Sequence, residues 1–98
     1  MKLRITIAMS HTIRDKEKLI ARVRRLKGQI EGIERALEAE KPCGEILRQL
    51  ASARGAMSGL TAEVMEDHLR EHVLQAETEA ERRQGGEELI GVIRTYMK

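Results

Sequence analysis

The stretch LIARVRRLKGQIEGIERAL, residues 19–37, decides the fold of this chain. Its apolar residues recur at alternating steps of four and three, which is the heptad pattern of a helix with one narrow apolar seam. The pattern predicts a helix that begins near Arg14 and ends before Pro42, because proline cannot continue a helix. The seam residues are Leu19, Val23, Leu26, Ile30, Ile33 and Leu37.

A second heptad pattern follows Pro42 and predicts a helix from Cys43 to about Glu79. Gln84-Gly85-Gly86 is the clearest breaker in the chain. A short third helix is predicted after it, and no strand pattern is visible. The sequence thus predicts an all-α protomer with two long antiparallel helices and a short carboxyl-terminal helix. The second seam contains Ile46, Leu50, Ala53, Met57, Leu60 and Val64, and the third helix has Leu89, Ile90, Ile93, Tyr96 and Met97 on its apolar side.

The chain is too small and too poor in aromatic residues to build a large core alone. It has 98 residues, no Phe, no Trp and one Tyr, and small chains bury a modest share of their surface. A hairpin also leaves one side of each seam in water, so we expect a dimeric four-helix bundle or a larger homo-oligomer. We expect residues 14–98 to form one domain and residues 1–13 a flexible arm.

Nothing in the sequence indicates a membrane protein or an exported one. No apolar run reaches the roughly 18 residues that a membrane span needs, and the first residues do not form a secretory signal. A single cysteine fits a reducing compartment, which predicts a cytoplasmic protein.

Charge is distributed unevenly, although the formal net charge is only +2. Residues 1–30 carry nine Lys/Arg against two acids, a net of +7, which predicts a polyanionic partner. Residues 61–80 carry six acids against Arg70, a net of −5, and they surround two histidines. A solvated helix face is the plainer explanation of either charge run taken alone.

Cys43, His68 and His72 are the strongest candidates for metal ligands. Thiolate and imidazole suit borderline transition metals, and histidines four residues apart share one helix face. The 25 residues from Cys43 to His68 span roughly 37 Å in one continuous helix. Only a second, antiparallel chain can then bring the cysteine to the histidines, which predicts a site between subunits. The alternative is a small buried cysteine with structural histidines.

Enzymatic chemistry is not expected of this sequence. It contains no Gly-rich phosphate loop, no H-E-x-x-H and no C-x-x-C. A Cys–His nucleophile would need an orienting group and a cleft, which a helical hairpin does not readily provide.

Several segments together resemble the CsoR/RcnR family of ligand-responsive transcriptional repressors. They are RRLKGQIEGI at 24–33, Cys43, RGAMSGL at 54–60, and the two histidines at 68 and 72. The resemblance covers about residues 9–98. It implies a disc-shaped tetramer of three-helix protomers, which binds double-stranded operator DNA without a helix-turn-helix and releases it when the ligand binds.

The resemblance also implies site residues. The nickel/cobalt sensors of the family use a His, Cys, His, His set, which matches His11, Cys43, His68 and His72 and implies Ni(II) or Co(II) as ligand. Copper(I) and persulfide sensors need a second cysteine, which this chain lacks. The residues that match or neighbour the family's DNA-binding positions are Arg22, Arg24, Arg25, Lys27 and Arg54.

Two alternatives stay open. The family's formaldehyde sensors share the Cys43 position, but they carry a proline directly after the initiator methionine, where this chain has Lys2 after Met1 or Ser10 after Met9. A metal-binding helical protein without a DNA function is the other alternative. Translation from Met9 would place the amine of Ser10 beside His11 as a further ligand, whereas translation from Met1 would not.

Overall fold

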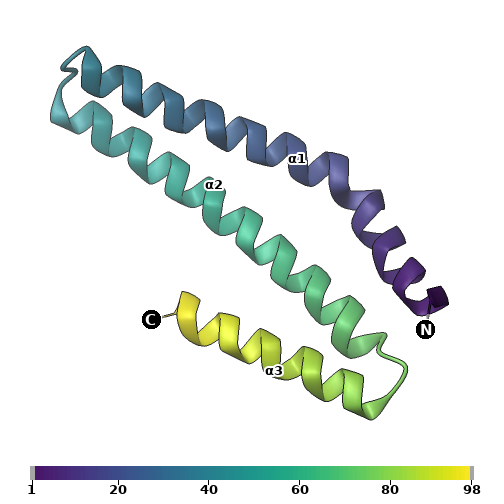
Figure 1. Cartoon of the computed structure of the whole chain (residues 1–98). Coiled ribbons are helices and arrows are strands. Elements are labelled where there is room, and N and C mark those ends of the chain that lie inside the picture. The colour runs from purple at the N-terminus through teal and green to yellow at the C-terminus, as the bar shows by residue number, and fades with distance from the viewer. Residues whose placement is uncertain (1, 98) are drawn as a thin grey trace. The chain divides into compact units, whose positions relative to one another are not determined.

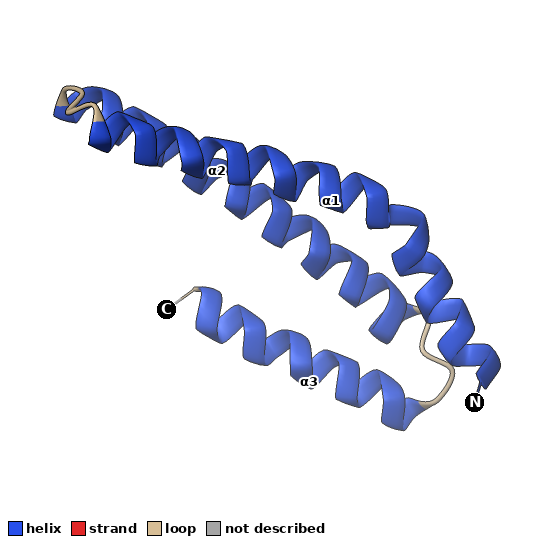
Figure 2. Ribbon diagram, turned by 45° about the horizontal axis from the view of Figure 1, so that its top comes forward, coloured by secondary structure: helices blue, strands red, loops and turns tan. Residues whose placement is uncertain are grey.

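Three α-helices and one π-helical turn are the helical elements of the described part of the chain. The computed structural model describes the backbone of residues 2–97 and the side chains of residues 15–97. In chain order, the elements are α1 (Lys2–Glu38), α2 (Cys43–Leu69), the π-helix η1 (Arg70–Leu74) and α3 (Glu79–Tyr96), shown in Figure 1. Residues 2–97 contain no strand, which confirms the predicted all-α protomer (Figure 2).

Helix α1 is longer than its heptad pattern predicted. It begins at Lys2 rather than near Arg14, because the intervening residues include neither Gly nor Pro to stop it. The functional division into an arm at residues 1–13 and a domain at residues 14–98 stays a prediction.

Residues 12–61 form one compact unit, in which α1 and α2 lie antiparallel beside each other. The turn between them is a Schellman motif: the Lys41 N–H donates to the Ala36 carbonyl at 2.9 Å, and the Glu40 N–H donates to the Leu37 carbonyl at 3.1 Å. Glu40 has φ 55°, the left-handed conformation that this motif requires. Pro42 follows at once, so the hairpin turns where its position predicted.

The heptad seams divide between two faces of each helix. Every second seam residue is turned inward, and Leu26 of α1 and Ala53 of α2 are only 6% and 9% exposed. The alternating residues remain between 47% and 58% exposed and recur every seven positions. We call this second set the outer stripe; it consists of Val23, Ile30 and Leu37 in α1 and Leu50, Met57 and Val64 in α2.

The other compact unit includes residues 62–97, in which α3 packs against η1. Helix α2 ends at Leu69 and widens into η1, whose last turn is closed by the Gln75 N–H donating to the Arg70 carbonyl at 3.0 Å. The predicted continuation of one α-helix to Glu79 is therefore wrong, since Glu79 is the first residue of α3.

The predicted break at Gln84-Gly85-Gly86 is also wrong, because these residues lie inside α3. The helix begins instead at a capping box: the Glu81 N–H donates to Thr78 Oγ1 at 3.1 Å, and the Thr78 N–H donates to Glu81 Oε1 at 3.3 Å. Packing of α3 on η1 offsets the cost of about 1 kcal/mol that a glycine brings to a helix interior.

The helices in the described part of the chain are too polar or too short to cross a membrane.

Replacing Thr78 tests whether the capping box fixes the start of α3. Thr78→Ala removes one bond of the box and weakens the other, and should lower the free energy of unfolding by about 1 kcal/mol in urea denaturation. Thr95→Ala is the matched control, because Thr95 Oγ1 donates to the Gly91 carbonyl at an exposed position of the same helix. Equal losses in the two variants would contradict a special role for the cap.

Candidate metal site and basic surface

Two predicted ligands, His68 and His72, lie side by side. Their ring centroids are 4.8 Å apart and the rings are tilted by 41°. His68 stands in the last turn of α2 and His72 in η1. Two imidazoles in neighbouring positions on one ion have centroids about 5 Å apart, since metal–nitrogen distances are about 2 Å. The spacing of the pair therefore fits a shared transition-metal ion.

The imidazole of His68 is held by α3. Its Nε2 lies 3.0 Å from the Gly85 carbonyl oxygen and 3.6 Å from Glu88 Oε1. A carbonyl oxygen can only accept, so Nε2 carries the proton of this hydrogen bond. When His68 is neutral, its other ring nitrogen, Nδ1, therefore carries the lone pair that could bind a metal ion. Metal-binding histidines commonly donate their other ring N–H to a carbonyl or carboxylate in this way, so the surroundings of His68 also fit a ligand.

The acids around the histidines are partly engaged elsewhere. Arg70 Nη2 lies 3.5 Å from Glu66 Oε1, and Arg70 Nη1 lies 4.0 Å from Asp67 Oδ1. These two carboxylates of α2 therefore face the cation of Arg70, the first residue of η1. The negative charge around the histidine pair is reduced accordingly.

Cys43 stands at the other end of α2. It is the first residue of that helix and is exposed. The carbonyl of Pro42, the residue before Cys43, accepts a hydrogen bond from the Ile46 N–H at 3.2 Å. Because α2 is uninterrupted as far as Leu69, the thiol and the His68 ring are separated by roughly 37 Å of helix. One protomer does not bring the cysteine and the histidines together.

The side chains of residues 15–97 contain no group of three His, Cys, Asp or Glu placed to hold a metal ion. The side chain of His11, the fourth predicted ligand, lies outside the described residues. Gly85 and Glu88 were not identified from the sequence, because their contact with His68 depends on how α3 packs rather than on a local motif.

The predicted DNA-contacting residues fall into separate groups within residues 12–61. Arg22 and Arg25 line a pocket with Gln29 of α1 and Ala56 of α2. Arg22 also reaches α2, because a Cβ atom added at Gly59 would lie 2.9 Å from Arg22 Nη2. This group combines cationic side chains from α1 with the adjoining surface of α2.

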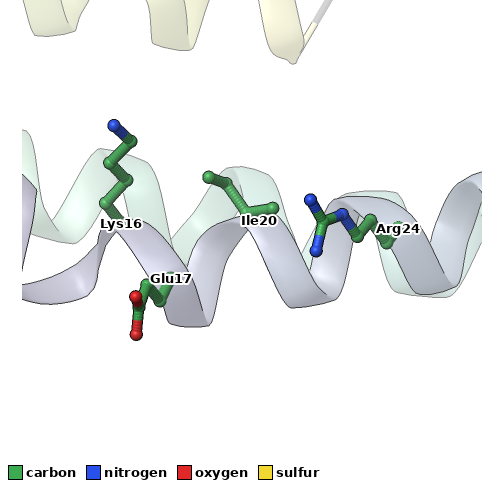
Figure 3. Close-up of a pocket in the computed structure, with 4 residues that line it drawn as sticks. All are labelled: Lys16, Glu17, Ile20 and Arg24. Carbon is green, nitrogen blue, oxygen red and sulfur yellow. The ribbon is translucent and has the colours of Figure 1, made fainter.

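Arg24 belongs to a different pocket of about 520 Å³, which is lined by Lys16, Glu17, Ile20 and Arg24 of α1 (Figure 3). Figure 3 shows Glu17 directed away from Lys16. At about 100° per residue, Arg24 and Lys27 lie on the opposite side of α1 from Arg22 and Arg25. Lys27 and Arg54 are exposed.

Comparisons with known proteins agree with one another. The family described as metal-sensitive transcriptional repressor matches residues 15–95. A Serratia marcescens protein known as the uncharacterized protein in the bioA 5′ region is 54% identical over 91 residues, which are 92% of this chain and 100% of the relative. The transcriptional repressor RcnR of Salmonella paratyphi B is 40% identical over 90 residues, again 92% and 100% of the two chains.

A solved structure has the same fold. It is a variant of the formaldehyde-responsive regulator FrmR from Salmonella enterica serovar Typhimurium, in which a glutamate is replaced by histidine. It matches with a TM-score of 0.79 and 43% identity over 85% of this chain and 94% of that chain. The chain therefore belongs to the metal-sensitive transcriptional repressors of the CsoR/RcnR family, which are regulators of transcription and not enzymes.

Proposed function

We propose that this chain is a nickel- or cobalt-responsive repressor, which holds double-stranded operator DNA in its metal-free form and releases it when Ni(II) or Co(II) binds. Family membership supports repression and a metal ligand. The observation that carries the choice of metal is the histidine pair at 4.8 Å together with a single cysteine. One thiolate among imidazoles suits Ni(II) and Co(II), whereas Cu(I) prefers more sulfur.

The proposed site joins two protomers. Two ligands of one ion lie within about 5 Å of each other, whereas α2 holds Cys43 and His68 far apart. Cys43 of one chain would therefore meet His68 and His72 of a second chain, with His11 as the fourth candidate ligand. The length of α2 thus argues for a homodimer as the smallest metal-binding unit.

The outer stripe supports the same assembly. Its residues repeat every seven positions and remain about half exposed, as expected of a helix pair that completes a four-helix bundle with a second copy. Burying the exposed half of each such side chain contributes about 1 kcal/mol. We propose a homodimer of this kind, and a homotetramer built from two of them.

The proposed DNA-contacting surface centres on Arg22 and Arg25, with Arg54 on α2. Their long cationic side chains suit contacts to phosphates, which position a protein on the duplex rather than read its sequence. Arg24 and Lys27 lie on the other side of α1, so a single straight duplex contacts one group more readily than both. A repressor of this kind acts where the DNA is, and we propose the cytoplasm.

Release of DNA follows from coupling between the two sites. Metal must bind the free protein better than the DNA-bound protein, and the coupling is reciprocal, typically about 1–3 kcal/mol. The Schellman turn provides a physical connection, because it fixes Cys43 to the end of the helix that carries Arg22 and Arg25. A change in the position of Cys43 would then be transmitted to α1.

A second candidate ligand is formaldehyde or another electrophile. The structural match to FrmR favours it, and the exposed thiol of Cys43 is accessible to such a reagent. Both candidates share the fold and the repressor function, and they differ in whether the two histidines take part as ligands.

Mixing variants tests whether the site is shared between protomers. Cys43→Ala and His68→Ala should each abolish high-affinity Co(II) binding, yet random exchange of the two should restore about a quarter of the native sites, since one of the two sites in each heterodimer is intact. The control mixes native protein with the Cys43→Ala/His68→Ala double variant, where exchange creates no new site. Absence of recovery, or full binding by a monomeric fraction, would count against an intersubunit site.

Ligand identity is tested by spectroscopy and by release of DNA. Co(II) should give a thiolate-to-metal charge-transfer band that Cys43→Ser abolishes, and Ni(II) or Co(II) should release the DNA upstream of the gene in a gel shift. His72→Ala should weaken the response to metal, while a response to formaldehyde should depend on Cys43 alone. Release by formaldehyde but not by saturating Ni(II) or Co(II) would favour the second candidate.

Salt dependence tests the DNA-contacting surface. The logarithm of the operator affinity of the metal-free protein should fall linearly with that of the salt concentration. Arg22→Ala or Arg25→Ala should reduce the slope by about one unit each, and Arg24→Ala is the matched variant on the opposite side of α1. A slope lowered by Arg24→Ala but not by the other two would place the duplex on the other face.

A further inference from the structure

We propose that Gly85 is a positioning residue for the histidine pair. The lack of a side chain at this position lets α3 approach η1 closely enough for the Gly85 carbonyl to accept the Nε2 proton of His68. The ring, which lies beside His72, then has Nδ1 as its ligand nitrogen. This inference rests on the metal-responsive function proposed above and assigns a role to a residue outside the ligand set.

Gly85 is required by space rather than by backbone conformation. It is the buried residue of α3 and has an ordinary helical φ. A Cβ atom added there would overlap the carbonyl oxygen of His72 and would lie 2.9 Å from both the carbonyl carbon and the Cβ of His72. The obstacle is mostly backbone, which cannot swing aside as a long side chain does. Any side chain at position 85 must therefore move α3 away from η1.

The same residue contacts both histidines. The position that a Cβ atom of residue 85 would occupy lies against His72. The carbonyl oxygen of Gly85 lies 3.0 Å from His68 Nε2. A displacement of α3 large enough to relieve this overlap would change the hydrogen bond to His68 and the contact with His72 together. Glu88, one turn further along α3, lies 3.6 Å from the same Nε2, so the displacement would also move the second group near that nitrogen.

The neighbouring glycine provides a matched control. Gly86 also lies inside α3, but a Cβ atom added there would meet nothing within 4 Å. Alanine raises helix propensity at both positions alike. A difference between Gly85→Ala and Gly86→Ala therefore reports the contact with η1 and not the behaviour of α3 as a helix.

The first measurement uses metal-free protein with ¹⁵N-labelled histidine. Long-range ¹H–¹⁵N correlation spectra at a pH where His68 is neutral should show the proton on Nε2 in the native protein and in Gly86→Ala. Gly85→Ala should show a mixture of the two tautomers. A native His68 with its proton on Nδ1 would overturn the proposal, and this measurement requires no variant to fold.

The second measurement is Co(II) affinity by competition with a chelator. Gly85→Ala should weaken binding by about 10–100-fold, as is typical when a partner of a ligating histidine is lost, and Gly86→Ala should bind as the native protein does. Circular dichroism must show that both variants fold. If Gly85→Ala does not fold, the tautomer of His68 in the native protein alone tests the proposal. Native-like affinity and tautomer in a folded Gly85→Ala would also overturn the proposal.

Failure of the proposed function has a different signature. Native protein that binds neither Ni(II) nor Co(II) would refute the metal-responsive function, whatever Gly85 does. A tautomer change confined to Gly85→Ala would in that case still support the positioning of His68 by Gly85. Native protein that binds Co(II) while Gly85→Ala binds it equally well would refute only the role of Gly85.

Discussion

The uninterrupted length of α2 is the constraint on which the proposed metal site depends. It begins at the residue after Pro42 and continues to Leu69 without a break, so a thiol and an imidazole at its two ends cannot contact the same ion within one chain. Every other feature of the proposed site follows from this separation. The proposed homodimer, the proposed sharing of ligands and the proposed coupling to α1 are all ways in which so long a helix could contribute to one compact site.

At its carboxyl-terminal end, near the histidines, α2 leads into a region that is held together by tertiary contacts. The π-helical turn holds His72, α3 packs against that turn, and a backbone carbonyl of α3 engages His68. Hydrogen bonds of this kind fix both the orientation of a ring and the nitrogen that bears its proton. A ring held in this way loses little conformational freedom on binding an ion, which would favour affinity at the proposed site.

The sequence was most informative where the cause is local. Heptad spacing predicted the helices on either side of Pro42, although not the start of α1 or the end of α2. Pro42 predicted the turn between them, because periodicity and proline act over a few residues. The break predicted at Gly85 and Gly86 was wrong because its cause is not local. Their low helix propensity suggested a break, whereas packing against η1 keeps them helical. A usable signal for the true boundary was present, since Thr78-Glu79-Ala80-Glu81 fits a capping box. Tertiary packing decides which seam residues are buried and which form the outer stripe. It also decides the contacts of Gly85 and Glu88 with His68. One sequence contains no direct sign of either.

The wide turn of η1 also limits how the length of this region can change. The Gln75 N–H donates to the carbonyl five residues back, whereas an α-helical bond would reach only four back. Each residue of an α-helix turns the chain by about 100°, so adding or removing one residue between His68 and His72 would rotate His72 away from His68. The segment between His68 and His72 should accordingly accept no insertion or deletion, which makes its length, rather than its composition, the property to compare among related chains.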